Sequence, residues 1–160
     1  MLHARGVRRL SLALPIVFAV HVLEEAPSFV SWFNSLVSPP ITERLFFSVN
    51  ITAFALTVGV AFLVVAAPEP VPAILAVAWV GFLMLANGLF HLVATVAHAR
   101  YCPGVVTGIL LYLPFGLLFM RSVVRELRVQ PSVVVAAALV GATPMLVHAY
   151  LIVFRGSRLF

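Results

Sequence analysis

The 160-residue chain is 63% hydrophobic and only 9% charged, and its mean hydropathy is +1.16. A soluble domain carries roughly 25% charged residues, so the composition excludes a globule covered by polar surface and predicts a polytopic membrane protein. The net charge of +5 comes from arginines near the ends of apolar runs, which indicates membrane topology and not nucleic-acid binding.

Five apolar runs are long enough to cross a bilayer as helices. They follow a basic head, Met1–Arg9, and short polar or proline-rich connections separate them. Their expected bounds are Leu10–Phe33, Leu45–Ala66, Ala73–His98, Val105–Met120 and Ser132–Phe154. We therefore expect an all-α polytopic membrane bundle of five transmembrane helices, forming one domain over residues 1–160, with no sheet.

The arginines predict an orientation, because five spans place the two termini on opposite sides of the membrane. A cytoplasmic N-terminus puts six arginines inside: Arg5, Arg8, Arg9, Arg121, Arg125 and Arg128. It leaves four outside: Arg44, Arg100, Arg155 and Arg158. The positive-inside rule thus favours a multi-pass protein of the cell membrane with its N-terminus in the cytoplasm.

The first run carries the most costly polar groups of the chain. His21, Glu24 and Glu25 follow the spacing i, i+3, i+4, which places them on one helix face. An ionisable group at membrane depth costs ~2.5–3.5 kcal/mol on insertion scales, so a functional role facing the bundle is the default hypothesis. Pro27 removes the amide that would bond the Leu23 carbonyl, and we expect the helix to bend or loosen there.

The third and fifth runs carry further polar groups at the depth of this motif. Asn87, His91, Thr95 and His98 follow spacings of four, four and three residues and form one stripe, and His148 lies about two-thirds of the way along the fifth run. The first, third and fifth runs all point outward in this topology, so at ~1.5 Å per residue these groups reach one layer. We expect one shared intramembrane site in the outer half of the bilayer.

The connection after the third run is expected to form a lid or rim over this site. Pro103 and Gly104 allow the chain to fold inward. Tyr101 then supplies a hydroxyl at interface depth, and Thr107 supplies a second one from the first turn of the fourth run. The alternative for Tyr101 is an aromatic anchor at the membrane interface.

Three motifs carry a resemblance to a known family. They are His21-Val22-Leu23-Glu24-Glu25, Asn87-Gly88-Leu89-Phe90-His91 and Tyr101-Cys102-Pro103-Gly104-Val105-Val106-Thr107. In this order they resemble the HXXEE family of small bacterial membrane proteins, which is named for the first motif. That family has no established activity, so the resemblance supports the location of the site and implies no reaction or ligand.

The first functional hypothesis is a metal-dependent membrane enzyme acting on a lipid-like or small apolar substrate. Imidazoles and carboxylates are ligands that zinc, manganese or iron accept, and one glutamate could stay free as a general base beside a metal-bound water. The single Cys102 excludes a cysteine-based metal cluster. The candidate metal ligands are His21, Glu24, Glu25, His91 and His148.

Two alternatives remain open at this point. One is a metal-free proton-transfer enzyme or proton-coupled carrier, in which a buried glutamate passes protons with histidine and asparagine. The other is a non-catalytic protein that holds haem or another ligand between histidines of two helices. Glu25, beside Pro27, is favoured over Glu24 as the exposed proton carrier. The candidate catalytic residues are Glu24, Glu25, Asn87, Tyr101 and Thr107.

Overall fold

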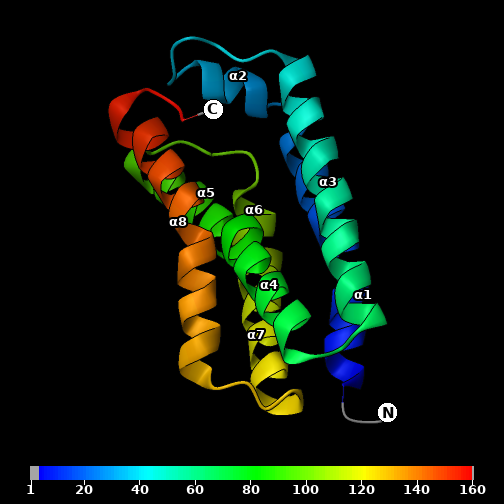
Figure 1. Cartoon of the computed structure of the whole chain (residues 1–160). Helices are drawn as coiled ribbons and strands as arrows, with labels where there is room; N and C mark the ends of the chain where they lie inside the picture. The colour runs from blue at the N-terminus through cyan, green and yellow to red at the C-terminus, as the bar shows by residue number, and fades with distance from the viewer. Residues whose placement is uncertain (1–3, 160) are drawn as a thin grey trace.

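The computed structural model describes residues 4–159, so Met1–His3 of the expected basic head and Phe160 lie outside it. Every regular element in the described range is a helix, and five helical stretches are long and apolar enough to cross a membrane (Figure 1). Their bounds are Arg5–Glu25, Glu43–Ala66, Pro70–Ala97, Val105–Glu126 and Pro131–Arg155. The prediction of an all-α bundle with five spans and no sheet is confirmed over these residues. One domain over residues 1–160 stays a prediction.

The first span is shorter than the sequence predicts. α1 (Arg5–Glu25) already begins inside the expected basic head and ends at the second glutamate of the motif. Pro27 offers no amide to continue the helical ladder, and the chain turns before α2 (Phe29–Asn34). The segment that follows α2 is hydrogen-bonded to residue Gly156, near the end of the last span (Figure 1). The expected span over residues 10–33 is therefore divided between two helices, and the bend or loosening expected at the proline is found as a turn between them.

The second span, α3 (Glu43–Ala66), follows a side-chain cap. Thr42 Oγ1 accepts a hydrogen bond from the Leu45 amide at 3.1 Å, which satisfies one of the free donors at the helix start. A short connection then leads to α4 (Pro70–Val80), whose first residue is a proline in the position where its missing amide costs nothing. α3 packs along α1 and against α4.

The third and fourth spans each contain a π-helical turn. η1 (Gly81–Ala86) separates α4 from α5 (Asn87–Ala97). η2 (Gly108–Tyr112) separates α6 (Val105–Thr107) from α7 (Leu113–Glu126). A π-turn rotates the following residues relative to a regular α-helix and often occurs at functional sites. Here η1 ends directly before α5 and η2 begins directly after α6, so both adjoin segments that carry predicted site residues.

The last span, α8 (Pro131–Arg155), packs closely against the third span. A Cβ atom on Gly81 would overlap the Ala138 backbone, and one on Gly141 would overlap the Ala78 backbone. The two glycines therefore allow the helix backbones to approach each other without an intervening side chain.

Hydrogen bonds hold each end of the bundle together. At one end, Glu126 Oε2 accepts from the Gly6 amide at 2.9 Å and the Val7 amide at 3.2 Å, so the end of α7 lies beside the start of α1. At the other end, here called the α2 end, the Ser38 amide donates to the Gly156 carbonyl at 3.2 Å. The first, third and fifth spans thus all run toward the α2 end, in the parallel arrangement that the sequence predicts.

The buried apolar side chains form two clusters along the bundle. One includes Phe18, Met84 and Tyr112, and the other, nearer the α2 end, includes Trp32 and Phe90. Along α1 and α5, the polar residues of the first two motifs lie at the boundary between these clusters.

Candidate functional site

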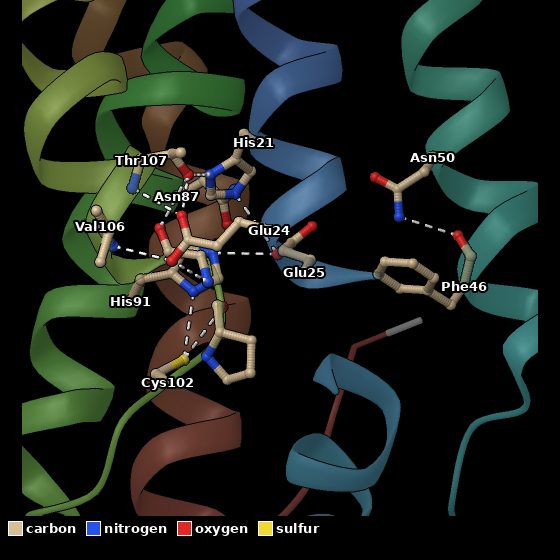
Figure 2. A network of polar contacts seen from close by, with 12 residues as sticks. His21, Glu24, Glu25, Phe46, Asn50, Asn87, His91, Cys102, Val106 and Thr107 are labelled. Carbon is tan, nitrogen blue, oxygen red and sulfur yellow. Dashed lines mark hydrogen bonds and ion pairs between the residues drawn. The ribbon is translucent and has the colours of Figure 1, made fainter. Parts of the chain in front are cut away.

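Three side chains of metal-ligand type meet at this boundary. His21 and Glu25 lie one turn apart on α1, and His91 faces them from α5 (Figure 2). Glu25 Oε1 lies 3.5 Å from His21 Nε2 and 3.2 Å from His91 Nε2. One ligand atom from each residue lies within 4.8 Å of the other two. All three residues are buried, with exposed fractions of 0%, 6% and 0%.

The Thr107 hydroxyl determines which nitrogen of His21 carries a proton. Thr107 Oγ1 lies 2.7 Å from His21 Nδ1 and also donates to Glu24 Oε2. An ionised carboxylate only accepts, so the single hydroxyl proton goes to Glu24 and the oxygen accepts from His21 Nδ1–H. In neutral His21 this leaves a lone pair on Nε2, where Asn87 Nδ2 donates at 3.1 Å.

Glu24 holds the loop that covers the site. Its Oε1 accepts from the Tyr101 hydroxyl at 2.7 Å and from the amides of Gly104 and Val106 at 3.1 Å each. Its Oε2 accepts from the Thr107 amide at 2.7 Å. The structure therefore engages Glu24 with the loop and does not bring it into the group of three ligands.

Tyr101 lies at the surface but turns its hydroxyl to the motif. The side chain is exposed, and the hydrogen bond to Glu24, together with partial burial, raises the pKa of Tyr101 to about 12. The loop thus folds back over the motif, as expected for a rim. The Tyr101 hydroxyl contacts Glu24, which is the contact expected of a rim residue, and the rest of the side chain is exposed.

Cys102 supports His91 from the other side. Its Sγ lies 3.2 Å from His91 Nδ1, and its amide donates to Thr95 Oγ1 at 3.2 Å. Burial raises the pKa of the Cys102 thiol well above its ordinary value, so the sulfur stays protonated. His91 Nε2 is buried and makes no hydrogen bond with any described residue, because its line to Glu25 Oε1 falls outside hydrogen-bond geometry.

Gly104, expected only to let the loop fold inward, packs directly on the imidazoles, and Tyr112 is a part of the site that sequence reasoning missed. Gly104 has φ +100°, and a Cβ atom there would lie 2.6 Å from His91 Cε1 and 2.9 Å from His21 Cε1. The ring of Tyr112 stacks on His21 with centroids 4.1 Å apart. A glycine in the third motif indicates a backbone position that can approach other groups closely. No sequence pattern predicts that Tyr112 stacks on His21, because Tyr112 lies in the π-turn η2.

Two further histidines of the prediction lie apart from the ligands. His148 is buried on α8, where its Nδ1 accepts from the Leu159 amide at 3.2 Å. It lines the neighbouring cavity and is not one of the three grouped ligands. His98 follows the end of α5 and is half-buried. The structure therefore brings His21, Glu25 and His91 together and leaves His98 and His148 outside this group.

A largely apolar cavity of about 310 Å³ adjoins the site. Its wall comes from α1, α2, the segment before α3, α3, η1, α5, α8 and the segment after α8. Most of the lining is aromatic or aliphatic, and Glu25 and Asn87 reach it from the site. Any group bound between the two histidines and Glu25 would therefore face a space suited to an apolar molecule.

The ligand spacing matches that around a small metal ion. A tetrahedral ion with bonds of about 2.0–2.1 Å holds neighbouring ligand atoms about 3.3 Å apart, close to the 3.5 and 3.2 Å found for Glu25 Oε1 and the two imidazoles. The ring centroids of His21 and His91 lie 4.9 Å apart with the carboxylate beside both. That arrangement leaves no layer for a porphyrin between them and gives the haem alternative no support.

Comparison with known proteins places these motifs in a family. Residues 12–119 match the family model described as a protein of unknown function with HXXEE motif. The chain is also 31% identical over 128 residues to the uncharacterized protein YrkK of Bacillus subtilis (strain 168), covering 76% of this chain and 80% of the relative. No solved structure matches. The chain belongs to the HXXEE family, whose naming residues are the His21, Glu24 and Glu25 described above.

Proposed function

We propose that His21, Glu25 and His91 bind one divalent transition-metal ion, and that the protein is a metal-dependent membrane enzyme acting on a small apolar or lipid-like molecule in the adjoining cavity. The observation that carries the proposal is the convergence of two imidazole nitrogens and a carboxylate oxygen in a buried space, at spacings that suit one ion. Buried lone pairs that face one another repel unless a cation lies between them.

The surroundings of the two histidines support this proposal. Metal-binding histidines usually hold their second ring nitrogen in a hydrogen bond that orients the ring. His21 Nδ1 has the Thr107 hydroxyl at 2.7 Å, and His91 Nδ1 has the Cys102 sulfur at 3.2 Å. In both residues the Nε2 atom faces Glu25, and that of His21 also has Asn87 Nδ2 at 3.1 Å, a contact that an ion would replace.

The chemistry of the ligands favours zinc, manganese or iron. Two histidines and one carboxylate leave coordination positions open, as catalytic sites require. The metal would act on a bound molecule as a Lewis acid or supply an activated water. Glu25 and Asn87 connect the ligand group to the cavity, so these residues lie where a substrate would meet the ion.

A second candidate function is metal-free proton transfer, which a row of neighbouring polar groups favours. From buried Glu25 the row passes through His21 and Thr107 to Glu24 and the exposed Tyr101 hydroxyl. Such a row connects the interior with the surface. In this function the space between the imidazoles would hold a shared proton and no metal.

The proposed location is the cell membrane, with the N-terminus in the cytoplasm. Five apolar helices indicate a multi-pass membrane protein. The end of α7 lies beside the start of α1, so the arginine-rich segments at residues 5–9 and 121–128 share one end of the bundle. The positive-inside rule favours that end as the cytoplasmic one and the α2 end as the outer one.

Metal analysis of purified protein separates the two functions. We expect about one ion per chain after incubation with zinc, manganese or iron and desalting, since all three ligands must be present to hold it. His91→Gln and Glu25→Gln should lose the ion, whereas His98→Gln, a half-buried histidine outside the ligand group, should keep it. Wild-type protein that retains no metal under these conditions would overturn the proposal in favour of proton transfer.

A further inference from the structure

The cavity beside the site has a second polar region, near the α2 end of the bundle. Arg158, from the segment after α8, and His148 both line the cavity. This segment is fixed in place by the hydrogen bonds from Ser38 to Gly156 and from Leu159 to His148. A guanidinium group therefore belongs to the wall of a cavity that is otherwise largely apolar.

The positive charge of Arg158 is not neutralised by the described part of the chain. Among the described residues, the acidic side chain found at salt-bridge distance from basic ones is Glu25, beside the two imidazoles, and Arg158 itself is half-buried. A half-buried guanidinium beside an apolar space is a binding group for a carboxylate or phosphate, which it holds through two parallel hydrogen bonds.

The two polar regions lie at different depths. Arg158 follows the end of α8, at the α2 end of the bundle. Asn87 lies ten residues before the end of α5, about 15 Å deeper at 1.5 Å per residue. Apolar side chains such as Phe33, Phe46 and Ile152 line the cavity with them. The cavity thus runs from a cationic group near the surface to the buried ligand group.

We propose that this cavity binds a single-chain amphiphile whose anionic head group, a carboxylate or a phosphate, pairs with Arg158 while its apolar chain extends toward Glu25 and Asn87. The volume of about 310 Å³ is at the small end of the range of ligand sites, roughly 300–1,000 Å³, which favours one short chain over a two-chain lipid. The claim that the chain is a substrate rests on the proposed metal function, whereas binding itself does not.

Radiolabelled decanoate tests this inference in protein reconstituted into phosphatidylcholine nanodiscs. We expect saturable binding that unlabelled decanoate and decyl phosphate displace. Decan-1-ol should displace it at least tenfold less well, because the alcohol lacks the charge, and a tenfold difference corresponds to about 1.4 kcal/mol. Failure of decyl phosphate to displace decanoate would assign the head group to the carboxylate class.

Three variants separate the head group from the chain. Arg158→Gln should weaken decanoate binding about tenfold, and Arg155→Gln, an exposed arginine of the same helix end, should leave it unchanged. Ala53→Phe, which adds a ring to the cavity wall, should block decanoate and decan-1-ol alike. Equal binding of acid and alcohol, or unchanged decanoate binding by Arg158→Gln, would overturn the inference.

His91→Gln distinguishes failure of this inference from failure of the metal proposal. His91 does not line the cavity among the described residues, so the variant should lose metal and still bind decanoate. Wild-type protein that binds decanoate through Arg158 but holds no metal would support this inference and refute the metal function. Protein that holds metal but binds neither decanoate nor decan-1-ol would support the metal function and refute this inference.

Discussion

Two neighbouring glutamates of one motif have opposite surroundings at the end of α1. Glu25 is 6% exposed and lies between two imidazoles, whereas Glu24 accepts hydrogen bonds from the loop over the site. Adjacent helical residues differ by 100° around the axis, so one points to α5 and the other to the loop. The expectation that Glu25 is the more exposed of the pair is wrong, because α1 ends before Pro27 and the loop leaves Glu24 at the rim.

Glu24→Gln should loosen the loop without removing a metal ligand. A hydrogen bond to a charged group contributes about 1.5–3 kcal/mol, so losing one should raise the population of the open loop roughly tenfold or more. Cys102, which is fully buried, reports this opening through its rate of alkylation by a maleimide. Glu43→Gln, an exposed glutamate at the start of α3, is the control. An unchanged rate in Glu24→Gln would show that Glu24 does not hold the loop.

The Tyr101 phenol gives a pH-dependent readout of the same contact. Its hydrogen bond to Glu24 raises its pKa from 10.0 to about 12. Because the folded-state pKa is raised, this contact stabilises the fold fully below pH 10 and is lost as the pH rises from 10 to about 12. An ultraviolet difference titration of wild type against Tyr101→Phe should show this value, and Glu24→Gln should return it toward 10. An ordinary pKa in wild type would exclude the contact.

At the scale of elements, the loop between α5 and α6 is held close to the imidazoles by a residue without a side chain. Gly104→Ala would place a methyl group 2.6 Å from His91 Cε1 and 2.9 Å from His21 Cε1, at φ +100°. Unfavourable backbone conformations of this kind cost about 1–3 kcal/mol, and the rings must also shift. We expect a lower melting temperature and a reduced metal content.

The matched control for this substitution is Gly59→Ala on α3. A Cβ atom there meets nothing within 4 Å, and alanine is the better helix former. This variant should keep the wild-type metal content and melt at the same or a slightly higher temperature. If Gly104→Ala behaves like Gly59→Ala, the loop does not pack on the imidazoles.

The elements themselves could be predicted because their signals are local. Apolar runs and prolines gave five spans, and Pro27 marked the break after α1. The two π-turns could not be predicted, because a shift from one hydrogen-bond partner to the next depends on the packing of neighbouring helices. Tyr112, which stacks on His21, lies in η2, and Asn87, which donates to His21, directly follows η1. These two contacts therefore could not be predicted from the sequence.

At the scale of the whole molecule, the topology is open to direct labelling. Glu69, before α4, and Arg100, after α5, lie at opposite ends of the third span. In a Cys102→Ser background, Arg100→Cys should react with a membrane-impermeant maleimide added to intact cells, and Glu69→Cys only after permeabilisation. Labelling of both positions from the same side would contradict the five-span arrangement, and the reverse pattern would contradict the orientation.

That the polar residues lie close together could be predicted at this scale, but the different position of each residue within the site could not. Spacing and depth indicated that His21, Glu25, Asn87 and His91 share one layer, because membrane spans run nearly parallel. His148 is expected in that layer and yet lines the neighbouring cavity, whereas His91 on α5 faces Glu25 of α1. Depth along a helix follows from sequence, whereas rotation about its axis requires the packing.

X-ray absorption of protein loaded with one equivalent of zinc tests the central claim, a buried ion held by two histidines and a carboxylate. The account predicts nitrogen and oxygen neighbours at about 2.0–2.1 Å and outer-shell scattering from two imidazoles. His91→Gln should lose the zinc on desalting, and with it the imidazole scattering, whereas His148→Gln should leave both unchanged. A sulfur neighbour at about 2.3 Å, scattering that does not respond to His91→Gln, or zinc that desalting removes from wild type would contradict the account.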